Sequence, residues 1–251
     1  MTEWLVLAVA MGLACAVVLI VTLVRHRRVP EDEDTAETPD VIEYMVMMVG
    51  VVYAIVLGLA IAGVWEARGA AEDGVRQEAQ ALHEISERAQ VYPPDTAERI
   101  RGDVERYSRH VAAVEWPRMI EHHELTDKGT RLLDDLRTDI ARRPPANDVE
   151  AQTYQPLLDQ VAAADEARRA RADNAEATLP GVVWFGLVAG AVVTVGLIFT
   201  LQIRRSAREL LLAGTFSALI AFLLFLVWNF DEPFGRSVTD SASAFQDLIS
   251  T

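Results

Sequence analysis

The sequence predicts an all-α membrane protein with four transmembrane helices and a helical-bundle domain inserted between the second and the third. Four apolar runs of about 21 to 25 residues are arranged two and two around a long polar stretch. At about 1.5 Å per residue, each run is long enough to cross a hydrocarbon core of about 30 Å. The polar stretch itself has helical periodicity, without the alternation that indicates strands.

The composition favours a membrane part joined to a water-facing part. Hydrophobic residues make up 51% of the 251 residues, yet 24% are charged, which is more than membrane helices alone would carry. The formal net charge of −14 argues against nucleic acid as the main partner. Cys15 is the only cysteine, which excludes a disulfide within the chain and a cysteine-based metal site.

Residues 1–28 predict the first transmembrane helix and its basic flank, with the apolar run extending from Trp4 to Val24. No basic residue precedes this run, and a basic cluster follows it. A cleaved secretory signal has the reverse order, so we expect a retained anchor. Residues 29–40 are polar and acidic and predict a disordered cytoplasmic linker.

Residues 41–65 predict the second transmembrane helix, which has a small residue at every fourth position. These residues are Gly50, Ala54, Gly58 and Ala62. On a helix they share one face and allow another backbone to approach closely. Gly186 and Gly190 repeat this spacing in the third span. The pattern indicates helix packing within one chain, self-association around a central axis, or both.

Residues 66–178 predict an extracytoplasmic bundle of amphipathic helices. Apolar stripes at helical spacing recur along this segment. Proline pairs at residues 93–94 and 144–145 interrupt the helices. Asn147 with Glu150 has the spacing of a capping pair, so we expect a helix to begin there.

One motif inside this segment combines a proline with a tryptophan and a carboxylate. Pro117 removes a backbone donor and is expected to kink or restart the helix, and Trp116 is expected to pack across the break. Glu115 could receive the freed amides or pair with an arginine such as Arg118. We interpret the motif as structural, with a ligand or gating role for Glu115 as the alternative.

Residues 179–203 predict the third transmembrane helix, and residues 204–230 a basic loop with the fourth. Short cytoplasmic loops collect Arg and Lys. The loop after the first span and the loop between the last two spans each carry three arginines. This pattern places the N terminus, residues 66–178 and the C-terminal tail, residues 231–251, outside the cytoplasm. Lys128 is the only lysine, and this arginine-rich composition favours a bacterial cell membrane.

Two adjacent carboxylates, Asp231 and Glu232, end the fourth span. In a symmetric oligomer they would form an acidic ring that concentrates cations at a pore mouth. Alternatively, Asp231 accepts backbone donors in a turn that Pro233 stops.

No cofactor, metal site or catalytic set is predicted. His122 and His123 lie between two glutamates, but neighbouring positions on a helix point about 100° apart, so the two rings would not hold one ion. The spacings of nucleophilic triads, phosphate-binding glycine loops and redox cysteine pairs are all missing from the sequence. We therefore do not expect an enzyme.

Several short motifs are spaced along residues 41–248. Their members are Tyr53, Gly58, Trp65, Glu66, Glu78, Ala79, Leu82, Tyr107, Glu115, Trp116, Pro117, Leu179, Pro180, Trp184, Asp231, Pro233, Phe234 and Gly235. In order and spacing, the motifs resemble the bacterial membrane family known as bestrophin-like domain proteins, and we expect mainly structural roles for them.

This resemblance implies kinship with bestrophins, which are pentameric anion channels with a cytoplasmic large domain. The arginine pattern places residues 66–178 on the opposite side, and the acidic mouth predicts cations. Our leading hypothesis is a homo-oligomeric ion channel or small-solute pore in the lipid bilayer, passing inorganic ions. The alternative is a non-conducting sensor or scaffold, because a helical bundle between two spans is also the layout of extracytoplasmic sensory modules.

Overall fold

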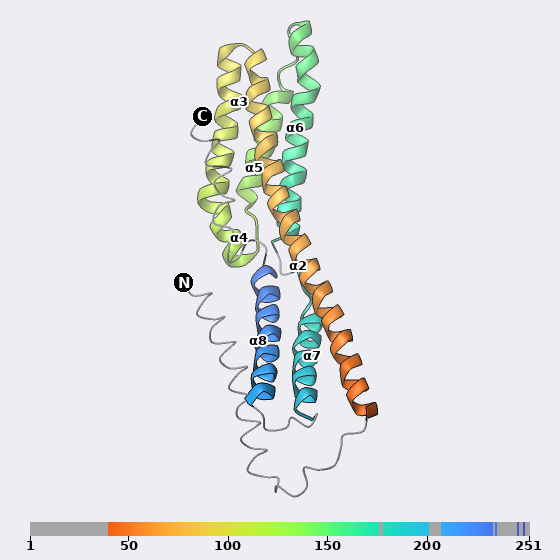
Figure 1. Cartoon of the computed structure of the whole chain (residues 1–251). Helices are drawn as coiled ribbons and strands as arrows, with labels where there is room; N and C mark the ends of the chain where they lie inside the picture. Colours follow the sequence, from red (N-terminus) through yellow and green to blue (C-terminus); the bar gives the residue numbers. More distant parts are fainter. Residues whose placement is uncertain are drawn as a thin grey trace, which may run out of the picture. The chain divides into compact units, whose positions relative to one another are not determined.

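The structure is a computed structural model that describes residues 40–175, 178–200 and 207–232, together with Phe234, Phe245 and Leu248 (Figure 1). Every regular element in these ranges is a helix. The first predicted span, the linker before residue 40, the basic residues 201–206 and most of the tail after residue 232 lie outside the described residues.

The helices follow one another with short connections. In chain order they are α2 (Asp40–Arg88), the 3₁₀ turn η2 (Ala89–Val91), α3 (Pro94–His110), the π-helical stretch η3 (Val111–Glu115), α4 (Trp116–His122), α5 (Asp127–Ala141), α6 (Asp148–Asp173), α7 (Gly181–Thr200) and α8 (Ala207–Phe230).

The chain divides into two compact units. Of the described residues, the first unit contains those up to Trp65 and those of Leu179–Asp231. The second contains Glu66–Thr178 and the described residues after Asp231. Because α2 runs unbroken from Asp40 to Arg88, it contributes its first part to one unit and its remainder to the other.

In the first unit, one face of α2 packs against α7 and α8. The buried α2 residues are Tyr53, Leu57, Ala60 and Val64, at positions i, i+4, i+7 and i+11. They meet Leu187 and Ala191 of α7, and Ile220 and Val227 of α8. One apolar stripe on α2 therefore shares a core with the other two described helices of this unit.

Two of the described helices are long and apolar enough to cross a membrane, Tyr44–Val91 and Leu211–Phe230, and Gly181–Leu197 is a shorter apolar helix. In the first of these, only 17% of the most apolar stretch is buried within the chain. Its remaining apolar side chains therefore face outward, where lipid or other protein would have to cover them.

The second unit has its own core, to which four helices contribute apolar stripes. Figure 1 shows the later part of α2 with α3, α5 and α6 around this core. Its central members are Val75, Leu82 and Ile85 of α2, Ile100, Val104 and Tyr107 of α3, Leu133, Leu136 and Ile140 of α5, and Leu157, Val161 and Ala164 of α6. The predicted amphipathic helices thus pack together into a bundle.

The helix starts in this unit follow the expected local chemistry. The Asn147 side chain accepts from the Glu150 backbone N–H at 2.9 Å, and the Glu150 carboxylate accepts from Asn147 Nδ2 at 2.8 Å, which confirms the predicted capping pair. At the earlier break, α3 begins at Pro94 with Pro93 at its N-cap. Proline suits the first turn, where its missing N–H has no helical partner.

Candidate functional site

The Glu115 motif lies in a continuous helical path instead of at a kink. η3 spans Val111–Glu115 with π-type geometry, and Pro117 falls in the first turn of α4. The extra residue of a π-turn rotates the following side chains relative to an α-helix, and such turns are frequent at functional sites. The predicted break therefore takes the form of a π-helical stretch that aims Glu115 into the bundle.

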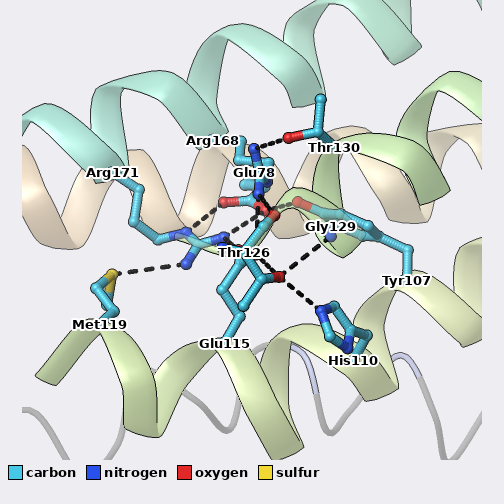
Figure 2. Close-up of polar contacts among 10 residues, drawn as sticks. All are labelled: Glu78, Tyr107, His110, Glu115, Met119, Thr126, Gly129, Thr130, Arg168 and Arg171. Atoms are coloured by element: carbon cyan, nitrogen blue, oxygen red, sulfur yellow. Dashed lines mark hydrogen bonds and ion pairs between the residues drawn. The ribbon is translucent and has the colours of Figure 1, made fainter. Parts of the chain in front are cut away.

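Glu115 is fully buried and is held by two arginines of α6 (Figure 2). Arg171 Nη2 lies 2.8 Å from Oε1, and Arg168 Nη2 lies 2.9 Å from Oε2. The predicted pairing of Glu115 with Arg118 is wrong, because the Arg118 guanidinium pairs with Glu124 at the surface. The same Oε2 also accepts from the Thr126 backbone N–H and hydroxyl, so its donors come from distant segments and not from the adjacent turn.

A second buried carboxylate, Glu78 of α2, extends this network. Arg171 Nε donates to Glu78 Oε2 at 2.8 Å, and Arg171 Nη2 is 3.2 Å from Oε1. The Tyr107 hydroxyl donates to the same Oε1 at 2.5 Å. Glu78, Tyr107 and Arg171 are all fully buried, so the network joins α2, α3 and α6 inside the core.

The ion pairs connect Glu78 to Arg171, Arg171 to Glu115, and Glu115 to Arg168. Negative and positive charges therefore alternate along this row of contacts, and the four formal charges cancel. Burial alone would raise the pKa of Glu115, but Arg171 and Arg168 lower it to about 2. Burial alone would lower the pKa of Arg171, but Glu78 raises it above its ordinary value. Burial and the neighbouring Glu78 raise the pKa of Tyr107 well above 10. Glu115 and Arg171 therefore remain ionised at neutral pH, with Tyr107 protonated as a donor.

Counting hydrogen bonds assigns the proton of His110. The Thr126 hydroxyl has one proton, which it donates to Glu115, and it accepts from the Gly129 N–H at 3.2 Å. Its remaining contact is with His110 Nε2 at 2.7 Å. Because a hydroxyl has only one donor, Nε2 must carry the proton and donate to Thr126. Burial lowers the pKa of His110, which favours this neutral form.

Gly129, in the first turn of α5, provides the space for this arrangement. A Cβ at this position would lie 2.4 Å from Glu115 Oε2 and 2.7 Å from Arg168 Nη2. Thr126 is the side-chain cap of the same helix. The turn that starts α5 therefore both caps the helix and closes over the carboxylate.

Aromatic residues pack beside the network, as the motif Trp116-Pro117 suggested. The Trp116 ring lies 5.7 Å from that of Phe234 in an edge-to-face arrangement, and 6.4 Å from that of Phe245. The Arg171 guanidinium lies 5.8 Å from the Phe245 centroid. Both phenylalanines are buried, so part of the C-terminal tail belongs to the core of the second unit.

In the first unit, Tyr53 of α2 lies against α7 at Gly190. The Tyr53 hydroxyl donates to the Leu187 carbonyl at 3.1 Å, and a Cβ at Gly190 would lie 2.6 Å from the Tyr53 ring. Gly190 thus serves helix packing within the chain. Trp65 is the last α2 residue of the first unit, and its ring lies edge to face with that of Phe230, with the two centroids 5.3 Å apart. Glu66, which follows Trp65 in α2, is exposed.

The small-residue face of α2 is open. A Cβ at Gly50 or Gly58 of α2 would meet no described atom within 4 Å, and the same holds for Gly186 of α7. Ala54 and Ala62 are exposed. Among the described residues, these positions therefore do not serve contacts within the chain, unlike Gly190.

Asp231 ties two helix ends of the first unit together. One carboxylate oxygen accepts from the Leu179 backbone N–H at 2.7 Å, and the other from Trp184 Nε1 at 2.8 Å. Its exposed fraction is 7%. Asp231 thus accepts a backbone donor, but the donor is Leu179, just before α7, and not a residue of a local turn. Glu232 is half-buried, and Pro233 lies outside the described residues.

In the part of the chain that the structure describes, no group of three His, Cys, Asp or Glu side chains could hold a metal ion. His122 is exposed and near Glu121. The His123 ring, by contrast, contacts the Ala175 carbonyl at 2.7 Å. The two histidines thus have different surroundings.

The two arginines of the buried network, Arg168 and Arg171, did not emerge from the sequence as site residues, although a signal for them was present. They continue the apolar stripe of α6 formed by Leu157, Val161 and Ala164, at the spacing i+4, i+7, i+11 and i+14. Charged residues at buried stripe positions are rare unless they are paired. This spacing therefore indicates buried carboxylate partners, though not which ones.

The chain matches a known protein family and resembles solved structures in fold. The family described as Bestrophin-like domain matches residues 12–245. Two crystal structures of a bacterial bestrophin homologue from Klebsiella pneumoniae, each with a point substitution, are similar in fold. One is 14% identical with a TM-score of 0.71, covering 97% of this chain and 99% of that chain. The other is 12% identical with a TM-score of 0.74, covering 97% and 96%.

A third crystal structure, described only as a membrane protein with a point substitution, is 13% identical with a TM-score of 0.71 and covers 98% of this chain and 99% of that chain. At these identities the likeness shows the fold, and no curated protein matches. The predicted all-helical fold and the family resemblance are confirmed. The chain belongs to the Bestrophin-like domain family.

Proposed function

We propose that this protein is one subunit of a homo-oligomeric membrane pore for inorganic ions, with α2 at the subunit interface around the pore axis. The bacterial bestrophin homologues of similar fold support this proposal. The domain boundaries predicted from the sequence are part of it: a first span with its basic flank at residues 1–28, further spans at residues 41–65 and 179–203, a basic loop with the fourth span at residues 204–230, and a bundle at residues 66–178.

The open face of α2 is the observation that carries the proposal. Large apolar side chains such as Val52, Ile55 and Leu59 are more than half exposed, which suits lipid or another protein surface. The small residues at Gly50 and Gly58 leave room for a helix backbone, which suits protein more than lipid. Another copy of α2 and the first predicted span are the two candidates, and we propose another copy.

The acidic mouth is retained as a proposal with separate roles for its two carboxylates. Both oxygens of Asp231 already accept hydrogen bonds within the first unit, so we assign Asp231 to holding α7 and α8 together. Glu232 is then the residue that would influence ions at the pore mouth.

Orientation remains a separate proposal. The arginines near residues 25–28 and 204–208 favour an extracytoplasmic bundle. Single cysteines at Thr35 and at the exposed Glu121, in a Cys15→Ser background, should react oppositely with an impermeant thiol reagent on intact cells. We expect labelling of Glu121→Cys alone. Labelling of Thr35→Cys alone would place the bundle in the cytoplasm, as in bestrophins.

Native mass spectrometry of the full chain in nanodiscs tests the assembly. We expect the wild-type protein to form a single closed oligomer. Gly58→Leu should instead give smaller species, because a leucine would push the neighbouring helix away. Gly69→Ala, at another open glycine of α2, is the control and should leave the mass unchanged. A monomeric wild-type protein would contradict the proposal and favour the sensor or scaffold.

A further inference from the structure

A short connection, residues 123–126, joins α4 to α5 and is fastened to the second unit at both of its ends. At one end, His123 Nδ1 lies 2.7 Å from the Ala175 carbonyl. Because a carbonyl oxygen only accepts, Nδ1 must carry the proton and donate. At the other end, the Thr126 carbonyl accepts from Arg168 Nη2 of α6 at 2.9 Å. The α4–α5 connection is therefore held by α6 and by the residues that directly follow α6.

The α4–α5 connection begins with a strained residue. Among the described residues, His123 is the only one other than glycine with a positive φ, and its φ of 56° and ψ of 26° lie in the left-handed region. Glycine is the usual residue in this conformation at a helix end, because a Cβ is disfavoured there. A strained backbone persists only where its surroundings hold it. The connection would therefore leave this conformation if its fastened ends were released.

The Thr126 end depends on a neutral His110 (Figure 2). The His110 ring donates to the Thr126 hydroxyl, which in turn donates to Glu115. In the described part of the chain, the charged groups that face this ring are Glu115 of η3, Lys128 of α5 and Arg168 of α6. Two arginines already balance the Glu115 carboxylate. A second proton on the ring would therefore add a positive charge that faces two others.

We propose that the α4–α5 connection is an acid-sensitive clasp of the second unit. Nε2 of His110 already carries a proton, so a further proton binds at Nδ1 and makes the ring a cation. Thr126 then separates from Glu115, the connection opens, and His123 leaves its left-handed conformation. Opening is favoured because it lets water reach the charged ring. This device lies wholly in the second unit and does not depend on ion conduction.

The electrostatics of His110 give the direction of the switch. Burial lowers the pKa of His110 from 6.5, and Lys128 and Arg168 lower it further against the opposing effect of Glu115. The open connection therefore binds the proton more readily than the closed one. The clasp is closed above pH 6.5, and proton uptake favours the open form as pH falls below that value.

Hydrogen exchange of the full chain in nanodiscs, measured at single amides, tests the proposal. The reporters are the Thr126 amide, which donates to Glu115, and the Gly129 amide, which donates to the Thr126 hydroxyl. We expect their protection factors to fall several-fold between pH 7 and pH 5, a range in which Glu115 stays ionised because its pKa is about 2. The Arg142 amide at the other end of α5, which donates to the Thr138 carbonyl, is the reference and should keep its protection.

Two histidine variants assign the effect. His110→Gln keeps a donor for Thr126 but does not titrate, so the two reporter amides should be equally protected at pH 7 and pH 5. His122→Gln, at an exposed histidine of α4, is the matched control and should retain the wild-type fall. A fall in His110→Gln as large as in the wild type, or its loss in His122→Gln, would overturn the proposal.

The wild-type measurement keeps the test valid even if His110→Gln folds poorly. Unchanged protection of the Thr126 amide at pH 5 would overturn the proposal. An equal loss of protection at Arg142 would also overturn it, because the acid would then be unfolding the whole of α5 and not opening the clasp.

Discussion

Arg171 and Glu78 lie 93 residues apart in the sequence and form a two-point ion pair in which both side chains are fully buried. A buried ion pair adds little net stability over an apolar pair, but removing one partner leaves an uncompensated charge. Because Arg171 also holds Glu115, it is the residue on which the charge balance of the second unit depends most.

Replacing this arginine is therefore expected to be severe. Arg171→Met should destabilise the second unit by about 3–5 kcal/mol, seen as a fall of roughly 10 °C in the apparent melting temperature. Arg169→Met on the same helix is the control, because Arg169 is exposed and its ion pair in the described part of the chain is with Asp165; it should change stability by less than about 0.5 kcal/mol. Adding Glu78→Gln to Arg171→Met should restore part of the loss, and equal effects of Arg169 and Arg171 would contradict the account.

Gly129 is predicted to be irreplaceable for a steric reason. In Gly129→Ala the new Cβ would lie too close to Glu115 and Arg168, so the network must move, at a cost of about 1–3 kcal/mol. Gly69→Ala, with open space around its Cβ, should instead stabilise α2 by up to about 1 kcal/mol. Thermal unfolding of the two variants compares them directly, and a neutral Gly129→Ala would show that the network can shift freely.

Acid should weaken the second unit in two steps. The pKa of Glu115 is lowered to about 2 from 4.5, so its contribution of about 3 kcal/mol is complete above pH 4.5 and is lost as pH falls toward 2. The pKa of His110 is lowered from 6.5 by burial and by Lys128 and Arg168, against the opposing effect of Glu115. Its contribution is complete above pH 6.5 and is lost as pH falls below that value.

Separate variants assign the two steps, measured as melting temperature against pH. His110→Gln keeps a donor for Thr126 but does not titrate, so the decline that begins below pH 6.5 should disappear while the steeper decline below pH 4.5 remains. Glu115→Gln should lower stability at neutral pH and flatten the lower step. An unchanged profile in His110→Gln would show that another group causes the first step.

The two kinds of glycine on the helices of the first unit should behave differently. Gly190→Ala would collide with the Tyr53 ring and should lower the melting temperature without changing the oligomer. Gly58→Leu meets open space within the described chain and should change the oligomer with little effect on the contacts inside one subunit. Melting temperature and native mass, measured on the same samples, separate the two effects. An unchanged oligomer mass in Gly58→Leu would mean that this face of α2 is exposed to lipid.

Local signals were sufficient for much of the fold. The apolar stripes of the bundle and the capping pair of Asn147 and Glu150 depend on residues close in sequence, so periodicity and cap chemistry predicted them. The break at Pro117 was located, but its π-helical form was not. A proline in the first turn of a helix fits both a kink and a continuing helix, so the proline alone does not decide between them.

Partner choice could not be predicted in the same way. The sequence suggested Arg118, three residues further along the chain, as a partner of Glu115, whereas the structure pairs Glu115 with Arg168 and Arg171. Pairing between separate helices depends on how their buried faces meet, which no local pattern contains. For the same reason, the sequence suggested packing at Gly50, Gly58 and Gly190 alike, and only the structure separates Gly190 from the other two.

Ion flux through the reconstituted full chain tests the central claim most directly. Liposomes containing the wild-type protein should show cation flux above that of empty liposomes, and Glu232→Gln should shift the reversal potential in a salt gradient toward anions. That shift should fade as salt rises, because charges are screened over about 8 Å at physiological ionic strength. Asp231→Asn should lower stability and leave selectivity unchanged. The absence of flux of any ion above empty liposomes, across pH and voltage, would contradict the pore and favour a non-conducting sensor or scaffold.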